Sequence, residues 1–198
     1  VRVVHASSSS VYGDAESYPT SEEALPRPIS PYGVTKLGAE HLAYAHARTG
    51  GLDAVALRYF TVYGPRQRPD MAFTRLLEAA AGGEPFPVFG DGSASRSFTY
   101  VADAVAATVA AMTRGAPGAV YNVGGGEEAS LQRVLELVQE LAGRAVPLER
   151  HGAAAGDVRR TSADVSRARA ELGWEPQTLL AAGLAAQWRW VAARVAAR

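Results

Sequence analysis

The 198-residue sequence predicts an α/β fold built on a parallel, doubly wound sheet. Short runs rich in apolar and β-branched residues, typical of buried strands, occur at 1–6, 53–60 and 119–123. A longer stretch with helical periodicity follows each of them, at 31–49, 71–82 and 130–142. Strands that alternate with helices favour parallel pairing, because each helix returns the chain across a face of the sheet.

The other elements follow in chain order. Ser30 is a suitable N-cap and Pro31 suits the first helical position, so the first helix is expected to begin there. A Gly/Pro-rich section with short strands spans 84–100 and leads into an alanine-rich helix at 101–114. After the helix at 130–142 we expect a strand at 145–149, a loop, and helices at 164–172 and 177–196.

Composition and charge restrict the classes of function. A formal net charge of zero and 47% hydrophobic residues describe a soluble globular protein with no general attraction for nucleic acids or membranes. The chain has no cysteine, its four histidines show no metal-ligand spacing, and no apolar run approaches the ~20 residues that span a bilayer. We therefore expect a cytoplasmic protein without a metal site and without a nucleic-acid or membrane partner.

A single lysine is present in a chain with nineteen arginines. Lys36 lies four residues after Tyr32, and this spacing places both side chains on one face of the predicted helix. An ammonium beside a phenol favours the phenolate, which can accept a proton during catalysis. The alternative is an exposed tyrosine and lysine with no catalytic role.

A run of serines ends the first predicted strand. Positions 7–10 are all serine, at the kind of strand end where open α/β sheets bind ligands. A polar turn is one interpretation of these hydroxyls. Together with the helix that carries Tyr32 and Lys36, they also form a Ser-Tyr-Lys set that can transfer protons.

Further motifs lie in order along the chain. They are Leu57-Arg58-Tyr59-Phe60-Thr61-Val62-Tyr63-Gly64-Pro65, Phe89-Gly90-Asp91-Gly92, Arg96-Ser97-Phe98-Thr99-Tyr100-Val101-Ala102-Asp103, Tyr121-Asn122-Val123-Gly124-Gly125-Gly126, Gly156-Asp157 and Glu171-Leu172-Gly173-Trp174. With the serine run and the Tyr32/Lys36 pair, these segments resemble the extended short-chain dehydrogenase/reductase family of NAD-dependent nucleotide-sugar epimerases and dehydratases. The resemblance covers nearly the whole chain.

The resemblance implies a Rossmann-like fold, NAD as cofactor, a UDP-sugar as substrate and a homodimer as the assembly. It assigns catalysis to Ser8, Tyr32 and Lys36. In this family the tyrosinate removes the proton of the sugar 4-hydroxyl, and a serine or threonine at the position of Ser8 shares that proton. Tyr32, Lys36 and Tyr59 are the residues expected to contact the cofactor.

The expected division of the chain follows the same resemblance. The later part of the NAD-binding domain corresponds to 1–62 and 101–144, and a smaller nucleotide-sugar domain corresponds to 63–100 and 145–198. The family's glycine fingerprint for NAD lies well before the serine run, so we expect the N-terminal portion of the same enzyme as a partner. The glycines at 124–126 lack the G-x-G-x-x-G spacing, and the acidic Glu127 and Glu128 would repel a pyrophosphate, so a plain strand-to-helix turn is expected there.

A set of residues is assigned to the substrate. It comprises Ser9, Ser10, Thr61, Arg66, Arg68, Val88, Phe89, Arg96 and Asp157. Arg96 suits a pyrophosphate clamp because a guanidinium fork matches phosphate oxygens, and Asp157 suits the ribose hydroxyls. A surface arginine and a turn aspartate are the alternatives.

Two of the serines indicate the course of the reaction. Dehydratases of the family carry an Asp-Glu pair where this chain has Ser9 and Ser10, and elimination needs a general acid and a base. Serine hydroxyls carry no charge near neutral pH, so the sequence favours a 4-epimerase, in which the 4-keto intermediate is reduced again. A non-catalytic nucleotide-sugar-binding fragment without the NAD fingerprint is the alternative of another class.

The segment Gly64-Pro65-Arg66-Gln67-Arg68-Pro69-Asp70-Met71-Ala72 indicates the sugar. Its two arginines can meet a carboxylate at C6, and with Thr61 the segment most resembles UDP-glucuronate 4-epimerases. Solvated loop cations or phosphate contacts are the alternatives. We expect conversion of UDP-glucuronate to UDP-galacturonate, with a UDP-glucose 4-epimerase or a UDP-glucuronate decarboxylase as the other possibilities.

Overall fold

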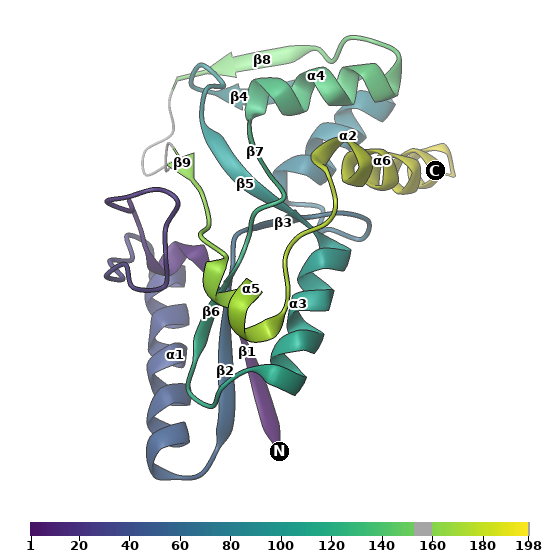
Figure 1. Cartoon of the computed structure of the whole chain (residues 1–198). Coiled ribbons are helices and arrows are strands. Elements are labelled where there is room, and N and C mark those ends of the chain that lie inside the picture. Colours follow the sequence, from purple (N-terminus) through teal and green to yellow (C-terminus); the bar gives the residue numbers. More distant parts are fainter. Residues whose placement is uncertain (153–159, 198) are drawn as a thin grey trace.

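A parallel sheet with helices on both faces forms one part of the molecule (Figure 1). The computed structural model describes residues 1–152 and 160–197. The strands of this sheet are, in order, β1 (Arg2–Ser8), β2 (Asp53–Tyr59) and β6 (Val120–Val123). The helices on its two sides are α1 (Pro31–Thr49) and α3 (Val101–Arg114). The predicted α/β fold with parallel strands is confirmed.

Alternation along β2 explains why both faces are covered. Val55 and Leu57 join the apolar core that includes Ala107 of α3. Arg58, the next residue after Leu57, faces the other way and pairs with Glu40 of α1. The two faces of the sheet therefore differ in chemistry: apolar towards α3 and ionic towards α1.

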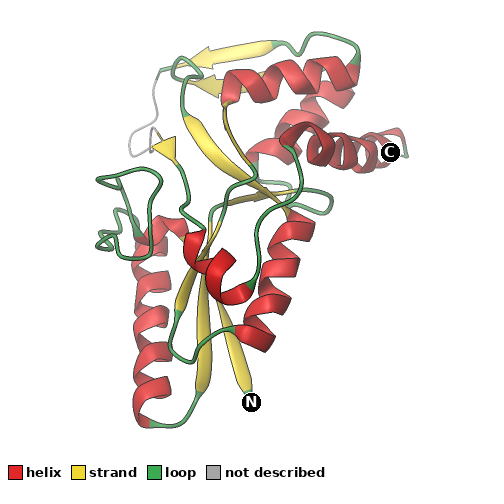
Figure 2. Cartoon of the chain, viewed as in Figure 1, coloured by secondary structure: helices red, strands yellow, loops and turns green. Residues whose placement is uncertain are grey.

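A second part contains shorter strands and three packed helices. Its mixed sheet has the order β3 (Thr61–Tyr63), β5 (Ser95–Tyr100) and β7 (Glu127–Ser130), with β9 (Arg160–Thr161) also paired to β5. A parallel pair, β4 (Phe86–Phe89) and β8 (Leu148–His151), lies beside it. Figure 2 shows how the three helices group together; they are α2 (Ala72–Gly82), α4 (Leu131–Ala142) and α6 (Leu180–Ala196).

The second part has its own aromatic and aliphatic core. The ring centres of Tyr63 and Phe73 lie 5.4 Å apart in an edge-on arrangement, and those of Phe73 and Phe98 lie 4.7 Å apart. Leu77 of α2 and Leu184 of α6 are fully buried against this cluster. Burial of such side chains contributes about 1.5–3 kcal/mol each, so this core holds β3, β5 and the three helices as one unit.

Several expected boundaries were wrong. The strand expected at 53–60 ends at Tyr59, and a separate strand, β3, begins at Thr61 and pairs with β5 instead of β1. A strand-to-helix turn was expected at 124–126, but the segment leads into a strand, β7. This strand runs antiparallel to β5, and α4 begins after it. The sequence of β7, Glu-Glu-Ala-Ser, has no β-branched residue, so it carries no strand signal; its pairing with β5 decides its conformation.

The last elements begin later than expected. The strand expected at 145–149 runs from Leu148 to His151, and the helix expected at 177–196 begins at Leu180. Residues before α6 stay extended, since the backbone N–H of Thr178 donates to Asp103 Oδ2 at 3.0 Å.

Core packing divides the chain differently from the expected domains. α4 lies in the range 101–144, yet its Val134 and Val138 belong to the core of the second part. α5 (Ser166–Leu172) lies in the range 145–198, yet Leu172 packs with the first sheet. What each part binds stays a prediction. Within the described ranges, no helix has the length and apolar character needed to cross a membrane.

Candidate active site

The carboxyl end of β1 carries the expected catalytic serine. Ser8 is 9% exposed, and its Oγ accepts a hydrogen bond from the backbone N–H of Ser10 at 3.1 Å. This bond caps a short 3₁₀ turn, η1 (Ser9–Val11), through which the chain leaves the strand. The Ser8 hydroxyl also donates to Ser10 Oγ at 3.1 Å. The three serines therefore lie together at one edge of the sheet.

The start of α1 lies directly against this serine turn. The expected N-cap is confirmed, because Ser30 Oγ accepts from the Gly33 N–H at 3.1 Å and Pro31 opens the helix. Gly33 permits the close approach, since a Cβ there would lie 2.5 Å from the carbonyl oxygen of Ser10. A larger residue at Gly33 would push the helix away from the serines.

Tyr32 and Lys36 occupy the exposed face of this helix start. Lys36 Nζ donates to the Ala6 carbonyl oxygen at 2.8 Å, which holds the ammonium at the end of β1. The same nitrogen lies 5.6 Å from the centre of the Tyr32 ring. Tyr32 is 54% exposed, so a substrate can reach it. The bond from Lys36 to Ala6 therefore holds the Tyr32/Lys36 pair next to the serine edge. The sequence spacing predicted the pair but not this bond.

A buried polar network lies beneath these residues and was missed by sequence reasoning. Glu40 of α1 and Arg58 of β2 are each 5% exposed and are joined by three hydrogen bonds, of 2.7, 3.0 and 3.2 Å. Ser7 Oγ donates to the same carboxylate. Burial is the largest single influence on Arg58 and would lower its pKa, but the hydrogen bonds and charges of Glu40 and Tyr12 together outweigh burial and raise the pKa. The position of Glu40, four residues after Lys36, was the available signal.

The hydroxyl of Tyr59, a residue expected at the cofactor, has a partner within the protein. It lies 2.6 Å from Thr108 Oγ1 of α3, and burial raises the pKa of Tyr59. Tyr59 thus packs against the apolar core on the α3 side of the sheet, with its hydroxyl bonded to that helix.

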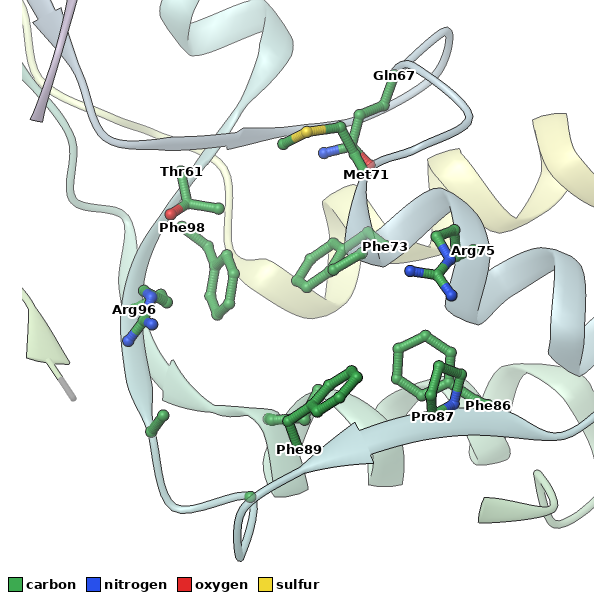
Figure 3. A pocket seen from close by; sticks show the side chains of 14 residues that line it. Thr61, Gln67, Met71, Phe73, Arg75, Phe86, Pro87, Phe89, Arg96 and Phe98 are labelled. Atoms are coloured by element: carbon green, nitrogen blue, oxygen red, sulfur yellow. The ribbon is translucent and has the colours of Figure 1, made fainter. Parts of the chain in front are cut away.

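A cavity of about 310 Å³ lies in the second part, between α2, β4 and β5 (Figure 3). Three expected substrate residues line it: Thr61, Phe89 and Arg96. Phe89 is 50% exposed and its ring stacks on His151 of β8, with centres 5.1 Å apart. Figure 3 shows Arg96 at one side of the cavity and Arg75, which sequence reasoning missed, at the other. Aromatic walls with a cation at each end suit a planar base linked to phosphates.

The other expected substrate residues lie outside this cavity. Arg68 is exposed and pairs with Asp70 at 3.2 Å, while Arg66 has a left-handed backbone, with a φ of 66°. Val88 is 1% exposed and packs in the core of the second part, because β4 alternates and turns Phe89 outward instead. Asp157 lies outside the described residues. In the described ranges no three His, Cys, Asp or Glu side chains gather as a metal site would require.

The family model for the NAD dependent epimerase/dehydratase family matches residues 1–124. This chain belongs to that family. A Bacillus subtilis protein named "Uncharacterized UDP-glucose epimerase YtcB" is 44% identical over 184 residues, which cover 91% of this chain and 57% of that protein. The chain thus spans well under two thirds of the length of this relative.

Solved structures agree with the family. The UDP-glucuronic acid 4-epimerase of Bacillus cereus, in complex with UDP-glucuronic acid and NAD, is 41% identical with a TM-score of 0.92, over 96% of this chain and 61% of that one. MoeE5 in complex with UDP-glucose and NAD is 48% identical with a TM-score of 0.92, over 100% of this chain and 66% of that one. The described residues therefore have the fold of the matched part of these two structures.

The residues of this chain fit one end of NAD. Lys36 has three N–H donors and gives one to Ala6, so two remain for the hydroxyls of a ribose. The glycines at 124–126 do not provide a phosphate cradle: a Cβ at Gly124 would meet Ala163 and Phe60, and one at Gly126 would meet the Phe98 carbonyl. They serve close packing in the turn that connects β6 to β7.

Proposed function

We propose that this chain carries the proton-transfer residues and the sugar-nucleotide site of an NAD-dependent UDP-sugar 4-epimerase. The observation that carries the proposal is the Lys36 ammonium, which is bonded to the end of β1 and lies beside Tyr32 and the serine edge. The family match and the bound ligands of the two solved structures support it.

Each of these residues has a distinct task in the proposal. The Tyr32 phenolate takes the proton of the sugar 4-hydroxyl, Ser8 hydrogen-bonds to the same oxygen, and the Lys36 ammonium stabilises the phenolate. Bound NAD would supply the redox chemistry at C4, as acceptor and then donor of the hydride, and Lys36 would hold its ribose. Ser9 and Ser10 offer no acid or base for elimination, so the ketone is reduced and not dehydrated.

The cavity in the second part is proposed to bind the UDP portion of the substrate. Phe89 stacks on the base and Arg96 binds the pyrophosphate. Val88 and Asp157 remain predicted substrate residues. The side chain of Val88 is buried, so a contact from Val88 would come from its backbone.

UDP-glucuronate is the proposed sugar. Arg66 and Arg68 lie in one loop, and Arg68 has an exposed partner, Asp70, which a sugar carboxylate can replace without breaking a buried contact. UDP-glucose is the second candidate, because the Arg68 guanidinium already pairs with Asp70 and so has a partner without a sugar carboxylate.

Product analysis tests the function and separates the candidates. The full-length protein is incubated with NAD and either UDP-glucuronate or UDP-glucose, and products are identified by NMR. The proposal expects UDP-galacturonate from the first substrate with little turnover of the second. A UDP-pentose would indicate a decarboxylase, and UDP-galactose alone would overturn the uronate assignment.

Calorimetry tests the alternative of a binding fragment. The 198-residue chain alone is expected to bind a UDP-sugar but not NAD at micromolar concentration, because the contacts proposed for Tyr32, Lys36 and Tyr59 include no cradle for the pyrophosphate of the dinucleotide. Micromolar NAD binding to this chain would contradict the expected need for the N-terminal portion. The homodimer and the cytoplasmic location remain predictions, and analytical ultracentrifugation tests the first.

A further inference from the structure

We propose that Glu40 and Arg58 form a positioning pair that sets the rotation of α1 and thereby places Tyr32 and Lys36 over the serine edge. The inference rests on the proposed function for the roles of Tyr32 and Lys36. Neither Glu40 nor Arg58 is expected to touch the substrate, since both side chains are buried between α1 and the sheet.

The packing of α1 is the first observation. This 19-residue helix buries two residues, Gly33 and Glu40, and no large apolar side chain among them. Val34, Leu42 and Tyr44 are each more than half exposed. A helix against a sheet is usually fixed by an apolar stripe. Leu37 packs partly buried against the cluster of Val11, Tyr12 and Phe60, so the rotation of α1 depends on this apolar contact and on its polar contacts.

The spacing along α1 is the second observation. Tyr32, Lys36 and Glu40 are separated by four residues each, so they follow one face of the helix over about 12 Å. Lys36 bonds to β1 through Ala6, and Glu40 bonds to β1 and β2 through Ser7 and Arg58. A rotation of α1 that moved Tyr32 would have to break the contacts of Glu40.

The reach of the network is the third observation. Arg58 also donates to the Tyr12 hydroxyl at 2.9 Å, and Tyr12 donates to Asn122 Oδ1 at 2.7 Å. Asn122 is fully buried in β6. The network therefore connects α1 to all three strands of the first sheet near their carboxyl ends, where the serine edge lies.

Energetics favour a positioning role over a purely stabilising one. The desolvation of a buried ion pair offsets most of its attraction, and apolar replacements are often as stable. What the pair supplies in addition is geometry, because an arginine fork holds both carboxylate oxygens in a fixed plane.

Glu40→Gln tests the inference, because it keeps the shape and removes the charge. We expect kcat to fall by about 10–100-fold with the KM for the UDP-sugar changed less than about twofold, since a displacement near 1 Å can have this effect on rate. The matched control is Asp53→Asn, which removes the charge of the 2.9 Å ion pair between Arg2 of β1 and Asp53, at the end of β2 opposite to Arg58. The control should leave kcat unchanged. Equal kcat values for both variants would overturn the proposal.

A second pair of variants separates positioning from stability. Glu40→Met combined with Arg58→Met replaces the ion pair by apolar groups and is expected to fold, with kcat still reduced at least tenfold. Full recovery of kcat in this double variant would show that the pair serves stability alone. If Glu40→Gln does not fold, Arg58→Lys, which keeps the charge but loses the fork, takes its place.

A spectroscopic measurement keeps the test independent of the proposed reaction. Fluorotyrosine at position 32 reports the surroundings of that ring by ¹⁹F NMR. The resonance should shift in Glu40→Gln and stay in place in Asp53→Asn. If the parent protein has no epimerase activity, the proposed function fails while this shift still supports the positioning pair; an unchanged resonance contradicts the pair in either case.

Discussion

Two polar networks hold the two functional regions, and they differ in charge. Beneath α1, the ionic pair of Glu40 and Arg58 lies in the interior of the first sheet region. Beneath the loop at 64–71, the side chains of Gln67, Thr74 and Gln187 form a neutral network. The first network is charged and buried, whereas the second is neutral and supports a loop with exposed arginines.

The neutral network fixes the loop backbone. Gln187 of α6 is fully buried, and its Oε1 accepts from the Gly64 N–H at 3.0 Å while its Nε2 donates to Gln67 Oε1 at 3.1 Å. Gln67 Nε2 in turn donates to the Val62 carbonyl at 2.9 Å. The loop can thus keep Arg66 at a φ of 66°, a conformation that costs energy for a side chain with a Cβ.

On the proposed function, the difference indicates which part is organised by contacts within the protein. The ionic network and the Lys36–Ala6 bond hold the helix of Tyr32 and Lys36 against the sheet. The amide network holds the loop backbone, yet the head of Arg68 stays exposed. We infer that proton transfer uses a prearranged site, whereas recognition of the sugar carboxylate orders side chains on binding.

The largest effect is expected from Tyr32→Phe, which removes the proton acceptor from the prearranged region. Turnover should fall by ~10²–10⁴ while the dissociation constant of the UDP-sugar stays nearly the same, because only proton transfer is lost. Steady-state kinetics and calorimetry measure the two quantities. The control is Tyr44→Phe on the same helix, where Tyr44 is also 54% exposed. Normal turnover with a tenfold weaker binding would remove Tyr32 from its assigned role.

Arg68→Ala removes the guanidinium that is proposed to bind the sugar carboxylate. A charged hydrogen bond to the sugar carboxylate is worth roughly 1.5–3 kcal/mol, so kcat/KM for UDP-glucuronate should fall about 10- to 150-fold. The kcat/KM for UDP-glucose should fall little, because this sugar has no carboxylate that would lose its partner. Arg66→Ala is the comparison, because Arg66 is expected nearer the phosphates and should affect both sugars alike. Equal losses for both sugars in Arg68→Ala would assign Arg68 to the pyrophosphate.

Gln187→Leu removes the central amide of the neutral network. The Gly64 N–H then has no acceptor, which should lower the free energy of unfolding by about 1–3 kcal/mol. The loop loosens with it, so the KM for UDP-glucuronate should rise while kcat changes less. Urea denaturation and kinetics check both. Gln177→Leu, at an exposed position, should change stability by less than about 0.5 kcal/mol. A loss of kcat alone would mean that the loop does not bind the sugar.

The smallest effect is expected in the pH dependence of the free energy of unfolding, through His5 near the ionic network. Burial, followed by the nearby charge of Lys36, lowers the pKa of His5 below 6.5, while Glu40 opposes this. The unfolded chain therefore binds the proton more readily, and the free energy of unfolding falls as pH drops through about 6.5. His5→Gln should lose less stability than the parent between about pH 7.5 and 5.5 in urea titrations. His41→Gln, at an exposed position of α1, should behave like the parent, and identical slopes in all three would contradict this account.

The sequence alone determined the local features of the candidate site. Ser30 and Pro31 are next to each other, and Lys36 follows Tyr32 by four residues, so capping rules and helical periodicity were enough to predict α1 and its pair. The strand at the chain start was predicted from an equally local signal, its apolar and β-branched residues. Apolar β-branched runs report burial without knowledge of the partner strand.

Tertiary structure decided every contact between distant residues. Arg58 lies 18 residues from Glu40, and Gln187 lies 123 residues from Gly64, so no periodicity connects them. β7 became a strand because β5 offered it hydrogen-bond partners, although its own residues do not favour one. A buried polar side chain needs a hydrogen-bond partner. The identity of one residue does not reveal which distant residue the fold brings to it.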